Sequence, residues 1–294
     1  MNKVDCVIGA IGNYNYDQIK YWVNSLNRSG FSGRKILLSY NSNFELVHEL
    51  VKNGIEVYEM THDSFAHKVE DFPCHTGYIT KENTELLVHH IRFWHMYQLI
   101  KELGEQNFRY IIHTDVRDVV FQQNPSLKLN NLSQTGKTIV APSEYLTYDI
   151  EKWNQELGLT NFGAYIHNFI LKDSLVYNVG SFAAETTDFL NICLMTYLMC
   201  YRRNKLADQP SQAILFNTVL KDKLYTATMK DGWALQCGTI AETNTYEKYK
   251  QYFKELPPII KDGYVCNSSG DVFSIVHQYE RVPEFKNLLE RKFN

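Results

Sequence analysis

The sequence lacks several features that would each assign the protein to a broad class. No stretch approaches the roughly 20 consecutive apolar residues that a membrane-spanning helix needs. The N-terminal segment Met1–Gly12 is too short and too mixed for a signal peptide, because Asp5 interrupts its apolar run. We therefore expect a cytoplasmic protein without a transmembrane segment.

Paired cysteines and an excess of one charge are also missing. The six cysteines are scattered and form no CxxC pair, which argues against structural zinc and a disulfide framework. The 30 Lys and Arg residues nearly balance the 33 Asp and Glu residues, giving a formal net charge of -3. This balance is typical neither of basic nucleic-acid-binding proteins nor of acidic tails, so we expect no nucleic-acid partner.

Aromatic residues, in contrast, are plentiful. They make up 14% of the 294 residues and include 20 Tyr and 16 Phe, which argues against extensive disorder. A ligand that stacks on rings, such as a sugar or a nucleobase, is one reason for such an excess. Ordinary core and surface packing is the more common reason, and composition alone favours it.

The first 120 residues alternate between strand and helix patterns. Predicted strands are Val4–Ile8, Lys35–Tyr40, Ile55–Tyr58 and Tyr110–His113, and predicted helices are Asp17–Asn27, Phe44–Val51 and Glu82–Leu103. This order predicts an α/β fold with a Rossmann-like, mostly parallel sheet flanked by helices. Ligands of such folds bind beyond the carboxyl ends of the strands.

The second half is less regular. We predict helices at Tyr145–Leu157, Thr187–Arg203 and Ser211–Leu220, strands at Val176–Phe182 and Lys223–Thr228, and a Tyr-rich surface loop at Thr239–Pro258. Within that loop, residues 243–252 are a candidate lid on the acceptor side. No repeat and no Pro-, Gly- or Ser-rich linker divides the chain, so we expect one domain over residues 1–294.

Two aspartates directly after the strand at residues 110–113 are the strongest chemical signal. Asp115 and Asp118 are three positions apart, so they would face opposite sides of a continuous strand and converge only across a turn. Carboxylate oxygens at a turn beyond a parallel strand suit Mg²⁺ or Mn²⁺. The alternative is a structural Asp pair that caps the turn and pairs with Arg117.

The segment Thr114–Gln122, TDVRDVVFQ, also resembles a known motif. It is similar to the metal-binding motif of nucleotide-diphospho-sugar glycosyltransferases of the GT-A fold, in a group where Asp-x-x-Asp replaces the usual DxD. The resemblance implies a metal-dependent glycosyltransferase, with UDP-sugars as favoured donors and Mn²⁺ or Mg²⁺ as cofactor. It further implies that residues 1–125 bind nucleotide and metal, and that residues 126–294 bind the sugar and acceptor.

Two later segments follow in the family's order. The first, Asn178 in YNVGSF and Asp208-Gln209 ahead of Asn217, resembles the N-x-G…DQ…LN arrangement of retaining members, which implies catalytic roles for Asn178, Asp208 and Gln209. Asp208 is alternatively a helix cap. The second, IVHQYERVP, resembles the late motif whose His277 would be the third metal ligand. The family's Lys after this His is missing, and Arg281 is the nearest cation that can meet a diphosphate.

Residues near the N-terminus complete the implied nucleotide site. In such enzymes the end of the first strand holds the base and ribose, which here points to Ala10, Ile11, Gly12 and Tyr14. A plain turn explains the glycines equally well, because the segment is not a GxGxxG fingerprint. Arg92, in the long helix before the acidic strand, would reach the donor phosphates or Asp115, with an ordinary surface arginine as the alternative.

The acceptor implied by the resemblance is a glycan, a lipid-linked sugar or a protein. Two other functions remain open at this point. A metal-dependent phosphohydrolase or nucleotidyltransferase could use the same carboxylate pair, and a catalytically inactive nucleotide- or glycan-binding protein could share the fold.

Overall fold

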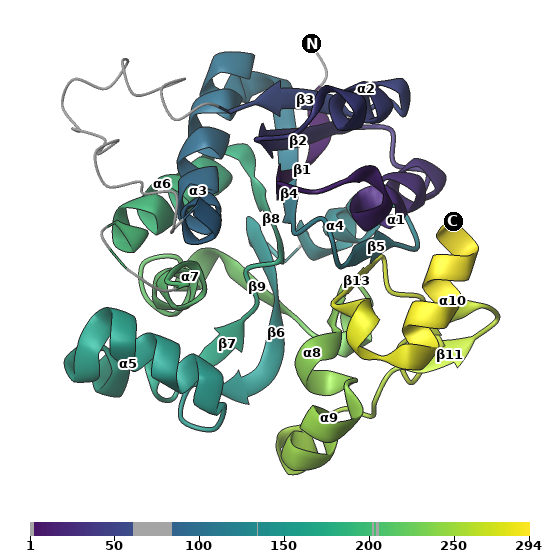
Figure 1. Cartoon of the computed structure of the whole chain (residues 1–294). Helices are drawn as coiled ribbons and strands as arrows, with labels where there is room; N and C mark the ends of the chain where they lie inside the picture. The colour runs from purple at the N-terminus through teal and green to yellow at the C-terminus, as the bar shows by residue number, and fades with distance from the viewer. Residues whose placement is uncertain (1–2, 61–83, 134, 202, 204–205) are drawn as a thin grey trace, which may run out of the picture.

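The computed structural model describes residues 3–60, 84–133, 135–201, 203 and 206–294. Its centre is a mixed eight-stranded sheet with the strand order β3-β2-β1-β4-β8-β6-β7, and β9 pairs with β6 (Figure 1). The strands of this sheet are β1 Val4–Gly12, β2 Arg34–Tyr40, β3 Glu56–Glu59, β4 Phe108–Thr114, β6 Ile139–Thr147, β7 Leu175–Tyr177, β8 Ser181–Glu185 and β9 Leu224–Ala227.

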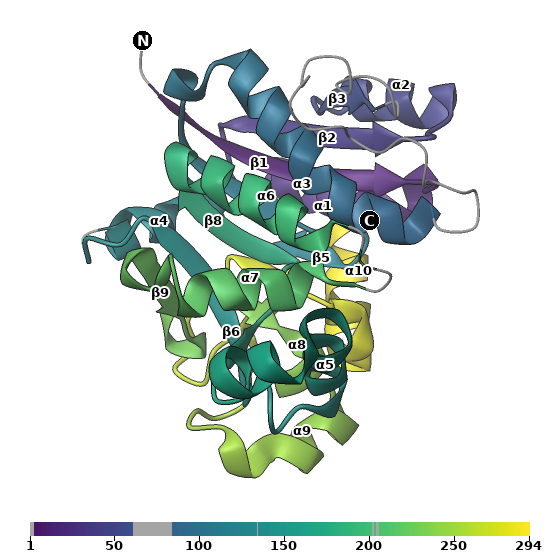
Figure 2. The same ribbon diagram turned by 90° about the vertical axis from the view of Figure 1, so that its left-hand side faces the viewer.

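Helices cover both faces of this sheet. The α-helices of the described residues are α1 Tyr16–Arg28, α2 Phe44–Lys52, α3 Thr84–Leu103, α4 Pro125–Ser133, α5 Lys152–Ile166, α6 Thr186–Cys200, α7 Asp208–Asn217, α8 Cys237–Ile240, α9 Thr243–Tyr249 and α10 Pro283–Phe293. Figure 2 shows α3 and α6 side by side across one face, and α1 lies behind the sheet. None of the helices in the described ranges is long and apolar enough to cross a membrane.

Strand β1 shows why both faces must be covered. Successive side chains of a strand point to opposite faces, and β1 is apolar at nearly every position. Cys6 and Ile8 pack in the core beneath α3 and α6, whereas Val7 and Ile11 pack in the core beneath α1 and α2. This strand therefore lies in the middle of the fold, with a hydrophobic core on each side.

The strand order reverses beside β1. The chain runs outward through β2 and β3, which are parallel to β1, and then returns to place β4 parallel on the other side of β1. This reversal is the topological switch point, where the carboxyl ends of neighbouring strands leave a ligand crevice. The end of β4 therefore presents Asp115 at the place where an α/β fold of this kind binds its ligand.

A second sheet brings the C-terminal segment to the same place. It has the order β10-β13-β5, formed by β10 Ala234–Gln236, β13 Ile275–His277 and β5 Val119–Phe121. Strand β13 is antiparallel to β5 and places His277 opposite Val119, while parallel β10 places Gln236 beside His277. A separate hairpin, β11 Ile259–Lys261 and β12 Tyr264–Cys266, packs outside this sheet.

The predicted α/β architecture is confirmed, but the second half of the prediction contains errors. The predicted helix Tyr145–Leu157 is wrong at its start, because β6 continues to Thr147 and α5 begins only at Lys152. Pairing of β6 with β7, β8 and β9 overrides the local helical pattern. The predicted loop Thr239–Pro258 instead contains α8 and α9, and Glu242 caps α9 by accepting the backbone N–H of Thr245 at 2.7 Å.

Candidate metal and ligand site

The acidic turn between β4 and β5 brings its two carboxylates to one side. Strand β4 ends at Thr114 and β5 begins at Val119, so the chain turns at residues 115–118, as the sequence predicted. Hydrogen bonds fix both ends of the turn: Asp115 donates its N–H to the Gly180 carbonyl at 2.9 Å, and Gln278 donates its N–H to the Asp118 carbonyl at 2.7 Å.

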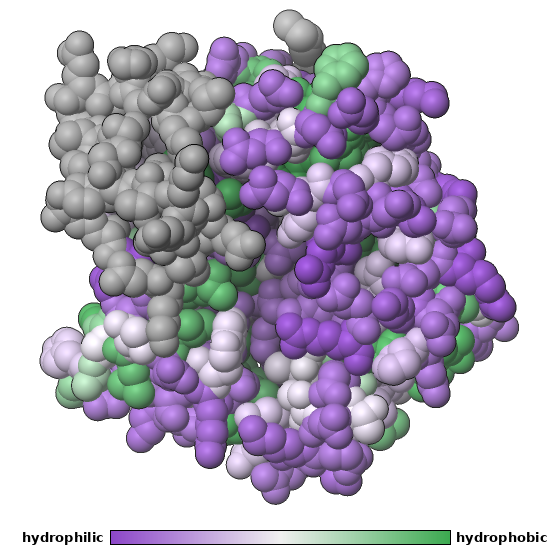
Figure 3. Space-filling view, viewed as in Figure 1, coloured by the Kyte–Doolittle hydropathy of each residue, from purple (hydrophilic) through white to green (hydrophobic). Residues whose placement is uncertain are grey.

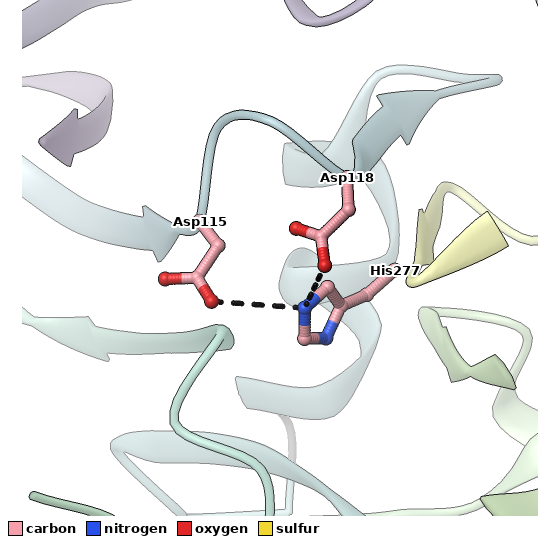
Figure 4. Close-up of side chains that lie close together, drawn as sticks. All are labelled: Asp115, Asp118 and His277. Carbon is pink, nitrogen blue, oxygen red and sulfur yellow. Dashed lines mark ion pairs between the residues drawn. The ribbon is translucent and has the colours of Figure 1, made fainter. Parts of the chain in front are cut away.

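His277 completes this cluster from the end of β13. Its Nε2 lies 3.7 Å from an Asp115 carboxylate oxygen and 3.6 Å from an Asp118 oxygen (Figure 4). The three candidate ligand atoms all lie within 4.8 Å of one another. The imidazole is 1% exposed, and its Nε2 has no hydrogen-bond partner. A buried, unpaired nitrogen facing two carboxylate oxygens fits a divalent cation held by one nitrogen and two oxygen ligands.

A neighbouring amide orients the imidazole. The Nδ1 atom of His277 lies 2.6 Å from Oε1 of Gln236, whose Nε2 donates to the Ser181 hydroxyl at 2.8 Å. Because the Gln236 amide already donates through its nitrogen, its oxygen accepts the Nδ1 proton. The lone pair of His277 is then on Nε2, the atom that faces the carboxylates. The sequence analysis had missed Gln236.

Gly180 makes the close packing of these groups possible. A methyl group at this position would clash with the His277 ring and would lie 2.8 Å from Oδ2 of Asp115. The close approach of the Asn178-Val179-Gly180 segment to His277 and Asp115 therefore requires a glycine at position 180.

Arg92 is buried beneath the acidic turn, so the surface alternative is wrong. Its guanidinium is 5% exposed and donates to Asp115 at 2.7 Å and to Asp208 at 3.2 Å. Burial alone would raise the pKa of the Asp115 carboxyl, but the charge of Arg92 and its hydrogen bond to this carboxyl outweigh burial and hold that pKa below its usual range. Asp115 is therefore ionised at neutral pH, as a metal ligand must be.

Arg117 does not neutralise the two aspartates. It donates to Glu280 at 3.0 Å in a partly exposed ion pair. The alternative reading, in which Asp115 and Asp118 serve only as structural partners of Arg117, is therefore wrong.

A cavity of about 450 Å³ opens beside the acidic turn. Several predicted site residues line it: Arg92, Asp115, Asn178, Asp208, Gln209, His277 and Arg281. It is also lined by residues that the sequence analysis had not singled out, among them Glu144, Glu151, Trp153, Asn154 and Gln278. The predicted catalytic residues and two of the three metal ligands thus share one cavity.

Asn178 connects β8 to an acidic residue on β6. Its side-chain amide donates to Glu144 at 2.8 Å, and its carbonyl oxygen accepts the N–H of Gly180 at 2.8 Å. Glu144 is 5% exposed, and burial raises the pKa of its carboxyl to about 7, although the hydrogen bond from Asn178 acts to lower it. This carboxyl therefore carries a proton through much of the weakly acidic range.

Asp208 and Gln209 begin α7 and contact two different helices, α3 and α5. Asp208 is the first residue of α7 and not its cap; it accepts the hydrogen bond from Arg92 described above. Gln209 donates its side-chain N–H to Asn154 at 2.6 Å. Asn217, at the far end of the same helix, donates to the Ala213 carbonyl and does not line the cavity.

The predicted nucleotide-binding residues of β1 lie next to this cavity but do not line it. Ile11 is fully buried in the core beneath α1, and Ala10 packs against the opposite core. Gly12 ends β1 beside Tyr40 of β2. Burial raises the pKa of the Tyr14 phenol, and the negative charge of Asp115 adds to this effect, which places the Tyr14 ring near the acidic turn.

Solved structures with similar folds are glycosyltransferases. The bifunctional glycosyltransferase WbbM matches with a TM-score of 0.58 and 11% identity, over 98% of this chain and 50% of WbbM. Mouse xyloside xylosyltransferase 1 matches with a TM-score of 0.57 and 13% identity, over 93% of this chain and 97% of that protein. The galactosyltransferase LgtC, in complex with donor and acceptor sugar analogues, matches with a TM-score of 0.52 and 13% identity, over 97% and 95% of the two chains.

The chain has the GT-A fold. It spans half the length of WbbM and nearly the whole length of the two other proteins. No family model matches the sequence, and no curated protein matches it in a sequence comparison. The GT-A assignment therefore comes from the arrangement of the backbone, which places the acidic turn and His277 at the switch point of the sheet.

Proposed function

We propose that this chain is a divalent-metal-dependent glycosyltransferase that takes a sugar from a nucleotide-diphosphate donor. A UDP-sugar is the favoured donor, and the acceptor is a glycan, a lipid-linked sugar or a protein. One observation carries the proposal: on a GT-A fold, Asp115, Asp118 and an unpaired His277 nitrogen converge beside a cavity of about 450 Å³. The LgtC structure, which contains donor and acceptor sugar analogues, supports the same donor class.

The two aspartates and His277 would hold Mn²⁺ or Mg²⁺. When bound, such a cation stabilises the negative charge that develops on a departing diphosphate. Arg281 is exposed at the cavity, and its guanidinium can donate two hydrogen bonds to phosphate oxygens. The Arg92 guanidinium is only 5% exposed and is paired with Asp115 and Asp208, so we assign it to holding these carboxylates in place and not to binding phosphate.

The nucleotide would extend from the acidic turn toward the end of β1. In this proposal the backbone of Ala10, Ile11 and Gly12 borders the base and ribose, and the ring of Tyr14 lies beside them. In this proposal residues 1–125 bind the nucleotide and the metal. Residues 126–294 bind the sugar and the acceptor and also supply His277 to the metal.

The sugar would occupy the cavity near Asn178, Asp208 and Gln209. Asp208 is engaged by Arg92, and Gln209 donates to Asn154, so both are held in fixed orientations before substrate arrives. The resemblance of these residues to those of retaining enzymes supports transfer with retention of the anomeric configuration. NMR of the first product formed would test retention, since a product of inverted configuration contradicts it.

The proposal is tested by incubating the chain with a panel of sugar nucleotides in the presence of Mn²⁺. We expect release of a nucleoside diphosphate from one donor, and loss of this release when a chelator removes the metal. Release of inorganic phosphate or pyrophosphate instead would favour a phosphohydrolase or nucleotidyltransferase. Metal-dependent nucleotide binding without any turnover would favour a catalytically inactive binding protein.

A further inference from the structure

Trp153 is the exposed tryptophan of this chain. The protein has four tryptophans. Trp22 and Trp233 are fully buried and Trp94 is 7% exposed, whereas Trp153 is 50% exposed and lines the cavity. It lies at the start of α5, over which Figure 3 shows pale and green side chains at the lower left of the view. An indole kept half in water at the mouth of a cavity leaves a large apolar face without a partner.

The backbone that carries this indole is fixed by hydrogen bonds. Glu151 caps α5 and accepts the backbone N–H of Asn154 at 2.7 Å and its side-chain N–H at 3.0 Å. The Asn154 side chain is in turn held by Gln209 at 2.6 Å. Trp153 therefore lies between the cap residue Glu151 and Asn154, and Asn154 is held by both Glu151 and Gln209 of α7.

These hydrogen bonds continue to the metal ligands. Gln209 follows Asp208, Asp208 accepts from Arg92, and Arg92 donates to Asp115. The segment around Trp153 is thus held in a defined position relative to the candidate metal site. Such preorganisation lowers the entropic cost of ordering a ligand against the indole.

The polar groups near Trp153 select the charge of that ligand. The carboxyls of Glu144 and Glu151 both line the cavity, and the negative charge of Glu151 adds to the burial that raises the pKa of Glu144. An anionic ligand would be repelled here. Carboxyl and amide oxygens accept hydrogen bonds, so they suit a ligand rich in neutral hydroxyl groups.

Most of the residues that line the cavity have polar side chains. Val179 and Leu206 are the aliphatic members of this lining, and amide, hydroxyl and charged side chains make up most of the remainder. A sugar ring combines the two features that this wall offers to a ligand. Its C–H face packs on an aromatic ring, and its hydroxyls donate to oxygen acceptors.

From this arrangement we propose that the acceptor is a neutral carbohydrate whose ring stacks on the indole of Trp153. This inference rests on the proposed transferase function, because it assigns the acceptor to the wall of the cavity that α5 forms. Trp153 is then the residue that determines specificity for the acceptor, while donor binding depends on the metal ligands and Arg281.

Tryptophan fluorescence tests the binding step without requiring turnover. The probes are methyl glycosides of glucose, galactose, xylose and N-acetylglucosamine, together with lactose, maltose and cellobiose. We expect at least one of them to shift the emission to shorter wavelength, because it removes water from the exposed indole. The shift should be absent in Trp153→Phe, which lacks the reporting indole, and should persist in Phe169→Ala. Phe169 is 75% exposed on the segment after α5 and does not line the cavity, so it is the matched control.

Kinetics with the saccharide that binds gives the second test. In Trp153→Ala we expect the KM for the saccharide acceptor to rise about tenfold, from the loss of stacking. The KM for the donor and its slow hydrolysis by water should stay unchanged. Trp153→Tyr should restore most of the acceptor affinity, which a merely structural role for the indole would not predict.

The outcomes separate the two proposals. Failure of every saccharide to shift the emission overturns the carbohydrate acceptor, as does a shift caused only by a serine- or threonine-containing peptide or by lipid micelles. An unchanged acceptor KM in Trp153→Ala also overturns it. A saccharide-dependent shift with no turnover of any donor would leave carbohydrate binding in place and remove the transferase function.

Discussion

Two carboxyl groups, the partly exposed Asp115 and the buried Glu144, line the same cavity and behave in opposite ways. Burial acts to raise the pKa of both. At Asp115 the charge of Arg92 reverses that effect and keeps the carboxyl ionised. At Glu144 the hydrogen-bonded neighbour is the neutral amide of Asn178, and the pKa rises to about 7.

This difference divides the cavity into two chemically distinct walls. The wall at the acidic turn, which we call the charged wall, carries the carboxylates and suits a cation with its phosphate ligand. We call the wall formed by β6 and α5 the neutral wall. It carries Glu144, whose carboxyl holds its proton up to nearly neutral pH, and it therefore suits neutral hydroxyl groups. A residue of the same chemical class thus has a different role according to whether a buried arginine lies next to it.

Removing a proposed metal ligand should give the largest loss of activity, because donor turnover depends on the bound metal. We expect Asp118→Asn and His277→Ala each to abolish metal-dependent donor turnover. Gln236→Ala should only weaken Mn²⁺ binding, by about 10–100-fold, because it removes the group that orients His277. Titration calorimetry with Mn²⁺ and the release of nucleoside diphosphate measure the two effects.

The control for these variants is Asp17→Asn, because the Asp17 carboxylate is 84% exposed on α1 and pairs with Lys20. It should bind Mn²⁺ as the unaltered chain does. Full Mn²⁺ affinity in both Asp118→Asn and His277→Ala would remove the assignment of the metal site.

Arg92→Met should cause the largest loss of stability. It leaves Asp115 and Asp208 without their buried cation, a change that typically costs about 3–5 kcal/mol in the free energy of unfolding. Arg117→Met breaks an exposed pair and should cost no more than about 1 kcal/mol. Urea unfolding of the metal-free protein compares the two, and equal losses would contradict the account of the charged wall.

Glu144→Gln tests the neutral wall through pH dependence. In the unfolded chain the Glu144 carboxyl loses its proton near the ordinary pKa of a glutamate, whereas in the folded chain it keeps the proton to about pH 7. The folded state therefore binds more protons between these values, and stability falls as pH rises through that window. The glutamine keeps the acceptor for Asn178 but cannot titrate. Between pH 4 and pH 8, the free energy of unfolding of Glu144→Gln should rise relative to that of the unaltered chain by on the order of 2 kcal/mol.

Urea unfolding of the metal-free Glu144→Gln variant and the unaltered chain at the two pH values measures this gain. The same pH dependence in both proteins would show that Glu144 is ionised in the folded state, and the contrast with Asp115 would fail.

Gly180→Ala probes the spacing of the charged wall. The added methyl group meets the His277 ring and Asp115, and overpacking of this kind costs about 1–3 kcal/mol. We expect a lower melting temperature together with weaker Mn²⁺ binding, since the ring must move. An unchanged melting temperature would mean that β8 can shift away from His277 at no cost.

The charged wall was largely predictable from the sequence. The acidic turn follows a strand whose apolar pattern is clear, and the residue spacing showed that Asp115 and Asp118 converge only if the chain turns between them. The resemblance to a metal-binding motif favoured that turn. His277 was found through its resemblance to a motif, since a single histidine in a sequence has no distinguishing pattern. Arg92 was correctly linked to Asp115, but its burial depends on the packing of α3 against the sheet.

The neutral wall was not predictable, because long-range pairing creates it. Glu144 lies on β6, whose proline and polar residues hide its strand character until β8 and β9 pair with it. Gln236 belongs to a strand of only three residues that exists by pairing with β13. Trp153 was placed within a predicted helix, but its exposure beside Asn154 depends on Gln209, which is 55 residues further along than Asn154.

The assignment of the nucleotide to the end of β1 stays a prediction. Ala10, Ile11 and Gly12 do not line the cavity, and their proposed contact with a nucleotide rests on their place beside the switch point. The aromatic excess also has a more specific meaning now, because one half-exposed ring, Trp153, stands at the cavity while most large rings are core residues.

Anomalous scattering from a crystal soaked with Mn²⁺ and UDP tests the central claim most directly. The account predicts one strong manganese peak between the carboxylates of Asp115 and Asp118 and the Nε2 atom of His277, with the diphosphate on the side of Arg281. A manganese peak elsewhere, or UDP bound away from this cavity, would contradict it.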